Sequence, residues 1–286
     1  MASLVLTRPG WPHPLNTYTI ELAKGLQTVG VDLFAAPLQR FVAQPLGPEQ
    51  HEQWRACLKK SASDRVWLVS TSPSAAYAMV QQPELLKDLS KAITSKRLII
   101  SGIGRASMMP LLRWIEQSGS PVEVLAPDGV GLAADPSPSV ERAGAKMSVT
   151  SADASAYLRW IGDQPIAADT LVLLEARQNR EDLALGLAPL CKRVLRLPIY
   201  RREALPMPVF SPRPSEPLFV VVTSSSLVTP AIEGLDRQDL PGQSVIWVAH
   251  HPAIVQAIRL QLPDADCLSV DGLEVDKMVE HIKLRL

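Results

Sequence analysis

Cysteine and histidine are too scarce and too scattered in this sequence to form the usual structural cross-links. The three cysteines, Cys57, Cys191 and Cys267, lie far apart without a CxxC pair, and the five histidines show no metal-binding spacing. Neither a disulfide framework nor a metal site is therefore indicated. His250 and His251 are adjacent but have no partner ligands nearby, so we interpret them as surface or helix-capping residues.

The chain also lacks an excess of charge and a long apolar run. Its 29 basic residues balance 29 acidic ones, so no overall basic field attracts a nucleic acid. No apolar run approaches the roughly 18 residues that span a bilayer, and the amino terminus has no basic segment followed by a long apolar stretch. We expect a cytoplasmic protein that binds neither nucleic acid nor membrane. With 286 residues it can form its own hydrophobic core.

Short runs of Val, Ile and Leu alternate along the chain with stretches whose apolar residues recur at helical spacing. This pattern is typical of an α/β fold in which helices cover a parallel sheet. We expect strands at 4–6, 31–35, 66–69, 98–100, 122–125, 171–174, 194–197, 218–222, 245–248 and 267–270. We expect helices at 16–28, 74–81, 105–118, 152–162, 180–190, 226–234, 252–262 and 273–285.

The two halves of the sequence resemble each other, which indicates an internal duplication. LVLTRPG near the amino terminus corresponds to LVLLEAR from residue 171, VWLVSTSPSAA corresponds to LFVVVTSSSLV, and RLIISGIGRAS corresponds to SVIWVAHHPAI. We therefore predict two doubly wound parallel-sheet lobes. In such sheets ligands bind at the carboxyl ends of the strands, and two lobes suggest a cleft between them.

Proline marks the expected connections, since 25 prolines stand against 15 glycines. The stretch EALPMPVFSPRPSEP at 203–217 is too rich in fixed backbone angles for a helix or central strand, so we interpret it as a semi-rigid connector. PLQRFVAQPLGPEQ at 37–50 is interpreted as a milder connector. The stretch 127–150 is expected to be a long surface loop, either an insertion or a mobile lid.

The turn GIGRAS at 102–107 follows an expected strand and opens an expected helix. It nearly matches the dinucleotide motif GxGxxG, and Glu123 and Asp128 lie at roughly the distance of a ribose-binding acid. The third small position is Ser107, however, and the turn lies in the middle of a half. Two interpretations stay open: an NAD(P) site, and a strand–helix turn that offers backbone N–H groups to some anion.

Cationic and hydroxyl side chains follow several expected strands. Arg8 ends the first strand, as either a cleft residue or a solvated turn residue. Ser70–Ser74 and Thr223–Ser226 occupy matching places in the two halves. In each run one hydroxyl is expected to cap the next helix, and the remaining hydroxyls and free N–H groups suit a carboxylate or phosphate. Tyr200 lies beside Arg201 at the expected seam between the lobes, as a packing residue or a proton donor.

Taken in order, TRP after the first strand, STSPSAA, GIGRAS, LEARQNREDL, IYRR and VTSSS resemble the uroporphyrinogen-III synthase family over nearly the whole chain. The resemblance implies two α/β lobes joined by a two-stranded linker. One lobe is discontinuous, at 1–37 plus 204–286, the other spans 42–197, and the linker strands lie at 38–41 and 198–203.

The resemblance further implies an activity. The enzyme would cyclise hydroxymethylbilane to uroporphyrinogen III, with inversion of ring D and loss of water, in the biosynthesis of haem. No metal or organic cofactor is implied. The expected partners are the linear tetrapyrrole and, transiently, the preceding enzyme of the pathway, and a monomer is expected.

The resemblance assigns Tyr200 to departure of the substrate hydroxyl. Ser107 stands where the family usually has Thr, and two turns depart from the family pattern. His250-His251-Pro-Ala253 stands where a Gly-x-x-Thr turn is expected, and ARQNR at 176–180 reduces an Arg-Gly-x-x-Gly-Arg run. We expect substrate to be bound by the arginines and serines of these motifs, namely Arg8, Ser72, Ser74, Arg105, Ser107, Arg201, Ser224 and Ser225.

These departures keep two other interpretations open. A catalytically weakened paralogue would bind a linear tetrapyrrole or a partner enzyme without closing the ring. A nucleotide-dependent enzyme of another two-lobed α/β kind would use the GIGRAS turn. Ring closure by the purified protein separates the synthase from the paralogue, and protection against thermal unfolding by NAD(P)H would favour the nucleotide enzyme.

Overall fold

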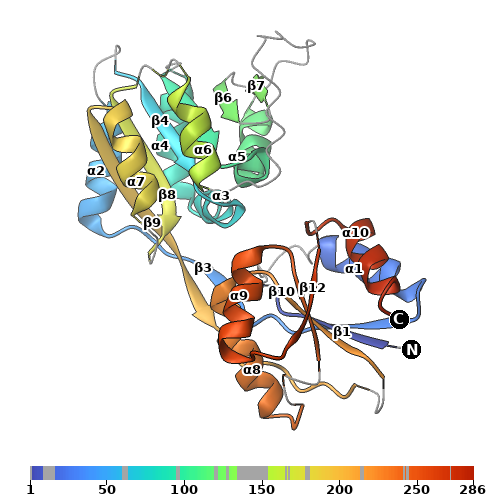
Figure 1. The fold of residues 1–286 in the computed structure, drawn as a ribbon. Helices are drawn as coiled ribbons and strands as arrows, with labels where there is room; N and C mark the ends of the chain where they lie inside the picture. Colours follow the sequence, from blue (N-terminus) through green and yellow to red (C-terminus); the bar gives the residue numbers. More distant parts are fainter. Residues whose placement is uncertain are drawn as a thin grey trace. The chain divides into compact units, whose positions relative to one another are not determined.

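The fold is that of a mixed α/β protein (Figure 1). The computed structural model describes residues 2–8, 17–59, 64–94, 97–118, 122–126, 129–133, 154–164, 166, 168–177, 181–212, 216–240, 242, 245–270 and 272–286. Contacts divide the chain into two compact units, which are unit 1 (Met1–Phe41 with Arg202–Leu286) and unit 2 (Val42–Arg201). None of the helices in these described ranges is both long and apolar enough to cross a membrane.

Unit 1 contains a five-stranded sheet in which all neighbouring strands run parallel. The order is β12-β11-β10-β1-β2. The strands are β1 (Ala2–Leu6), β2 (Val31–Ala35), β10 (Leu218–Val222), β11 (Ile246–Ala249) and β12 (Asp266–Ser269).

Helices cover both faces of this sheet (Figure 1). On one face lie α8 (Val228–Asp236) and α9 (Pro252–Gln261), and the short 3-10 helix η2 (Ser225–Leu227) leads into α8. On the other face α1 (Thr17–Gln27) packs beside α10 (Val275–Lys283). The unit is therefore doubly wound, as the sequence predicts.

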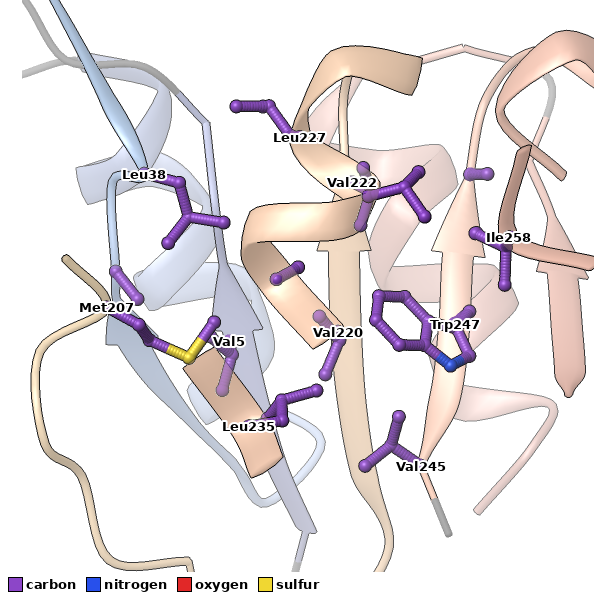
Figure 2. Close-up of a cluster of buried hydrophobic side chains, with 14 of the residues drawn as sticks. Val5, Leu38, Met207, Val220, Val222, Leu227, Leu235, Val245, Trp247 and Ile258 are labelled. Atoms are coloured by element: carbon purple, nitrogen blue, oxygen red, sulfur yellow. The ribbon is translucent and has the colours of Figure 1, made fainter. Parts of the chain in front are cut away.

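Alternation along the strands explains why both faces are apolar. In β1, Leu4 belongs to the core under α1 and α10, and the next residue, Val5, belongs to the core under α8 and α9. Successive side chains of a strand point to opposite faces, so a strand covered on both sides is apolar at every position. Figure 2 shows the second of these cores, in which the Trp247 indole of β11 lies near Val220 and Ile258.

Unit 2 contains a seven-stranded sheet with the order β3-β9-β8-β4-β5-β6-β7. The pairings from β9 to β6 are parallel, and β7 is antiparallel to β6. The strands are β3 (Gln39–Ala43), β4 (Val66–Ser70), β5 (Leu98–Gly102), β6 (Val122–Ala126), β7 (Gly129–Ala133), β8 (Thr170–Ala176) and β9 (Arg193–Ala204).

The helices of unit 2 also occupy both faces of its sheet (Figure 1). One face is covered by α6 and α7, which share a core with β4, β5 and β8. On the other, α3 packs against α5, and α2 packs against α4. The bounds are α2 (Pro48–Lys59), α3 (Pro73–Val80), α4 (Pro83–Thr94), α5 (Arg105–Ser118), α6 (Ala154–Gly162), α7 (Asp182–Leu187) and the 3-10 helix η1 (Ala188–Leu190).

The two sheets repeat one pattern, which agrees with the predicted duplication. Five parallel strands have the order β2-β1-β10-β11-β12 in unit 1 and β9-β8-β4-β5-β6 in unit 2. Strand β1 thus corresponds to β8, β10 to β4, and β11 to β5, which are the three pairs of segments that match in sequence. The GIGRAS turn after β5 therefore corresponds to the His250 turn after β11.

The boundary between the units falls inside two paired strands. The chain leaves unit 1 within β3, between Phe41 and Val42, and returns to it within β9, between Arg201 and Arg202. The expected linker strands at 38–41 and 198–203 overlap β3 and β9.

Several elements correct the sequence interpretation. The stretch 37–50 is not only a connector, because it contains β3 and the start of α2, and the sequence pattern predicts neither α2 nor α4. Both helices begin at a proline, Pro48 and Pro83, and proline at the first helical position is favoured rather than disruptive. Strand β7 lies inside the expected loop 127–150, of which 127–128 and 134–150 lie outside the described residues.

Candidate functional site

A buried tyrosine and a helix-capping serine meet at the carboxyl ends of the strands of unit 2. The Tyr200 hydroxyl lies 3.2 Å from the Ser72 hydroxyl, and Tyr200 is only 2% exposed. Ser72 lies two residues after the end of β4 and one residue before α3, and Tyr200 lies in β9. Strand β8 lies between β4 and β9 in the sheet. The topology thus brings together two residues that are 128 positions apart in the sequence.

A β-bulge sets the position of Tyr200. The register of β8 and β9 shifts between Glu175, which pairs with Pro198, and Ala176, which pairs with Tyr200. The extra residue changes the direction of the side chains that follow it. The Tyr200 carbonyl accepts a hydrogen bond of 2.9 Å from the Arg177 N–H, which fixes the backbone after the bulge.

The Ser72 hydroxyl is held by its own helix. Ser72 has the extended backbone of an N-cap residue, and its Oγ accepts a hydrogen bond of 3.1 Å from the Ala75 N–H. The Ser70 hydroxyl donates to the Ser72 carbonyl at 3.0 Å, and the Thr71 hydroxyl donates to the Leu174 carbonyl at 2.9 Å. The sequence-based expectation that one hydroxyl of this run caps α3 is confirmed. The capped end also carries the positive end of the helix dipole.

The GIGRAS turn joins β5 to α5 in unit 2, and α5 packs against α3. Ser107 is 7% exposed, and its N–H donates to the Gly104 carbonyl at 2.9 Å. Ser74, in the first turn of α3, is also buried. The Arg105 side chain lies outside the described residues.

Gly102 is required at the end of β5 because a side chain has no room there. A Cβ atom would lie 2.7 Å from Met108 Cγ and 3.1 Å from the Ser70 carbonyl oxygen. We expect Gly102→Ala to lower the free energy of unfolding by about 1–3 kcal/mol, which is the usual cost of overpacking. Gly162→Ala is the control, since nothing lies within 4 Å of its Cβ position. Urea denaturation of both variants checks this, and equal stabilities would contradict it.

Unit 1 carries a second group of polar side chains at the carboxyl ends of its strands. Arg8 follows β1, and its guanidinium carbon lies 4.6 Å from the centre of the Tyr18 ring of α1. Such a contact is a cation–π interaction. Burial lowers the pKa of Arg8 from its ordinary value, and burial raises the pKa of Tyr18. Arg8 is therefore packed against α1 and is not a fully solvated turn residue.

Serines follow β10 in unit 1. Ser224 caps η2, where its Oγ accepts a hydrogen bond of 3.4 Å from the Ser226 N–H and lies 3.0 Å from the Ser226 hydroxyl. Ser225 is exposed in the first position of η2. The helix expected to begin at residue 226 starts instead as a 3-10 turn at residue 225, followed by α8. The capping role expected for one hydroxyl of this run is confirmed.

The two adjacent histidines have different environments. His251 Nδ1 accepts a hydrogen bond of 3.1 Å from the Ala253 N–H and caps α9, which confirms the capping interpretation for this residue. His250 is half-buried, and burial, with His251 and Arg8 nearby, lowers its pKa. Within the described residues, no three His, Cys, Asp or Glu side chains cluster as metal ligands.

Comparison with solved structures gives the fold. The chain matches a mutant uroporphyrinogen III synthase from the extremely thermophilic bacterium Thermus thermophilus over 99% of this chain and 98% of the other, with a TM-score of 0.54 and 15% identity. It matches the uroporphyrinogen-III synthetase from Helicobacter pylori 26695 over the whole of both chains, with a TM-score of 0.54 and 9% identity. The chain has the uroporphyrinogen III synthase fold. In sequence, neither a protein-family profile nor a curated protein matches it.

The uroporphyrinogen III synthase fold positions most of the expected site residues at the carboxyl ends of strands. Tyr200 and Ser72 are in contact, and Ser74 and Ser107 lie on the packed helices α3 and α5. Arg201, which follows Tyr200 in β9, is exposed. The remaining expected residues that are described lie in unit 1, namely Arg8, Ser224 and Ser225.

The sequence does not indicate Tyr18, and it indicates His250 only weakly. Tyr18 had no signal of its own, because its position in α1 suits an ordinary half-buried aromatic residue. His250 did have a signal, since it stands where the family resemblance predicts a glycine. No partner for it is visible along the sequence, however, so the sequence alone predicts a surface or capping residue.

Proposed function

We propose that this protein is a uroporphyrinogen-III synthase, which cyclises hydroxymethylbilane to uroporphyrinogen III with inversion of ring D and loss of water. The observation that carries the proposal is the likeness to two solved synthases over essentially the full length of each chain. The contact between Tyr200 and Ser72 supports it, because it provides a positioned hydroxyl pair at the carboxyl ends of parallel strands.

The proposed chemistry begins with loss of the substrate hydroxyl. Tyr200 donates its proton to the departing hydroxyl, which leaves as water. The Ser72 hydroxyl then donates a hydrogen bond to the Tyr200 oxygen at the observed distance of 3.2 Å and stabilises its negative charge. The positive end of the α3 helix dipole, at the end that Ser72 caps, also stabilises this negative charge. Ring closure releases one proton, which restores Tyr200, so that water is the only net product besides the macrocycle.

The substrate has eight carboxylate groups, which require cationic side chains and N–H donors. Arg8 presents a guanidinium at the end of β1, a group that binds carboxylates through two parallel hydrogen bonds. The backbone N–H groups at the start of α3 are suited to a further carboxylate. Each of these groups would fix one carboxylate of the substrate, which is a positional contribution to catalysis.

Removal of the Arg8 side chain tests this binding role. We expect Arg8→Ala to raise the half-saturating concentration of hydroxymethylbilane about tenfold, the effect of losing one hydrogen bond to a charged group, with a smaller change in turnover. Arg237→Ala is the matched control, because it removes one exposed positive charge from the same unit. Steady-state kinetics on both variants provide the measurement. A loss of turnover without a change in half-saturation would instead assign Arg8 to the transition state.

One alternative is favoured by a specific observation. The turn after β11 carries His250 and His251 where the family resemblance predicts Gly-x-x-Thr, so a paralogue that binds a linear tetrapyrrole without closing it is the second candidate. Incubation with freshly generated hydroxymethylbilane separates the two. A synthase consumes the substrate faster than the spontaneous reaction and enriches isomer III. With a binding paralogue, the isomer composition stays the same as in the protein-free control.

A further inference from the structure

Three neighbouring strands of unit 1 end with polar residues on the same face of the sheet. Leu6 of β1 and Val248 of β11 both belong to the core beneath α1 and α10. Side chains alternate between the two faces of a sheet. Arg8 follows Leu6 by two residues and His250 follows Val248 by two residues, so both side chains lie on that same face. Strand β10, which lies between β1 and β11, continues with Thr223. The topology therefore places a cation and an imidazole on either side of one strand end, beneath the same helix layer.

Tyr18 of α1 completes this group, which we name the Arg8 cluster (Arg8, Tyr18 and His250). Its ring lies under the Arg8 guanidinium at 4.6 Å and packs against the core of this face. The Tyr18 hydroxyl and His250 Nδ1 are both buried, and neither has a hydrogen-bond partner among the described residues. Within the same ranges, no carboxylate forms an ion pair with Arg8. A buried polar atom without a hydrogen-bond partner is unfavourable, so two such atoms beside the Arg8 guanidinium indicate a site for a ligand.

The electrostatics of the cluster favour an anion. Burial lowers the pKa of His250, and the nearby side chains of His251 and Arg8 lower it further. Burial also lowers the pKa of Arg8. Burial raises the pKa of Tyr18, and Glu274, just before α10, adds to this effect while Arg8 opposes it. Tyr18 is thus a neutral O–H donor at pH 7, and an arriving negative charge stabilises the cationic forms of Arg8 and His250.

We propose that Arg8, Tyr18 and His250 form a receptor for one carboxylate group of the tetrapyrrole, and that His250 takes up a proton when this group binds. The proposal rests on the proposed function for the identity of the ligand. The guanidinium and the Tyr18 hydroxyl donate hydrogen bonds to the carboxylate. The imidazolium donates from both ring nitrogens, so protonation ensures that Nδ1, the atom without a partner, is a donor.

The direction of the pH dependence follows from this linkage. The free protein holds His250 mostly neutral near pH 7, and the bound carboxylate raises its pKa. Proton uptake on binding therefore occurs at pH values between the pKa of His250 in the free and in the bound protein. The protonated form binds more tightly, so affinity falls as the pH rises through this window.

Calorimetric titration of the full-length protein with uroporphyrin III, a stable octacarboxylate, measures this uptake. Titrations near pH 7 in two buffers with different heats of ionisation give the number of protons taken up. We expect net uptake by the wild type, its loss in His250→Asn, and its retention in His281→Asn, which removes a histidine bonded to the Lys277 carbonyl of α10. Tyr18→Phe keeps the ring under Arg8 and is expected to weaken binding about tenfold.

Each outcome decides for or against the cluster. Equal proton uptake by His250→Asn and the wild type overturns the proposal, as does the absence of uroporphyrin binding. Inorganic phosphate serves as a second ligand. If phosphate binds with the same His250-dependent uptake and displaces uroporphyrin, the cluster is a phosphate site and the carboxylate assignment is wrong. Ring closure measured on the same preparation tests the proposed function separately, because binding with His250-linked uptake but without closure upholds the receptor and rejects the synthase.

Discussion

Tyr200→Phe is expected to lower the turnover of hydroxymethylbilane at least tenfold while the protein stays folded. The change removes only the hydroxyl, which lies 3.2 Å from Ser72 Oγ and which we propose as the proton donor to the leaving group. Ser72 Oγ keeps its hydrogen bond from the Ala75 N–H, so it is not left without a partner. The cost in stability is therefore about 1 kcal/mol or less, that of one hydrogen bond between neutral groups. Turnover at saturating substrate and urea denaturation together give both quantities.

Tyr157→Phe is the matched control for this variant. The Tyr157 hydroxyl is also buried in unit 2 and lies 2.7 Å from Ser101 Oγ, which in turn accepts a hydrogen bond from Trp67 Nε1. Burial raises the pKa of Tyr157, so the hydroxyl is a neutral structural group. We expect its loss to lower stability and leave turnover within about twofold of the wild type, a change of less than about 0.5 kcal/mol in the barrier. Unchanged turnover in Tyr200→Phe would remove Tyr200 from the mechanism.

Trp247→Ala is expected to have the largest effect on stability, about 3–5 kcal/mol. The Trp247 side chain is fully buried between β11 and the helices α8 and α9, in the core shown in Figure 2. Its Nε1 also donates a hydrogen bond of 2.8 Å to the Gly242 carbonyl. Truncation leaves a cavity and removes the hydrogen-bond donor of the Gly242 carbonyl. Both effects destabilise unit 1.

Hydrogen exchange measured by mass spectrometry resolves this prediction along the chain. We expect protection to fall in β1, β10 and β11 and to be maintained in β4 and β8, because each unit has its own core. Leu260→Ala is the control on α9, since this side chain is 78% exposed and its truncation is expected to change stability by less than about 0.5 kcal/mol. Equal loss of protection in both units would show that they unfold together.

The strands of this fold were predictable because the sheets are buried on both faces. Runs such as VWLV in β4 and LVLL in β8 are apolar at every position, and all residues of both strands are buried. Helix α2 shows the opposite case. Its sequence PEQHEQWRACLK buries only Trp54, Cys57 and Leu58, and Pro45 just before it together with Pro48 at its first position suggested a connector. Weak amphipathicity and misleading proline signals therefore hid a helix that tertiary packing stabilises.

The candidate site was predictable only as a set of strand-end residues. The duplication and the strand pattern indicated Tyr200 and Ser72 separately, and the family resemblance linked them to the same reaction. Their direct contact depends on the bulge at Glu175 and Ala176, which no local feature of the sequence announces. The Arg8 cluster depends in the same way on long-range placement, because Tyr18 and His250 are 232 positions apart and acquire a shared role only through the parallel sheet.

Single-turnover cyclisation is the most direct test of the central claim that this fold closes a tetrapyrrole ring. Excess purified protein is mixed with freshly generated hydroxymethylbilane beside a protein-free control, and the oxidised porphyrin isomers are then separated by chromatography. The account predicts that isomer III predominates and that Tyr200→Phe slows its formation. Isomer I at the level of the protein-free control would contradict the claim.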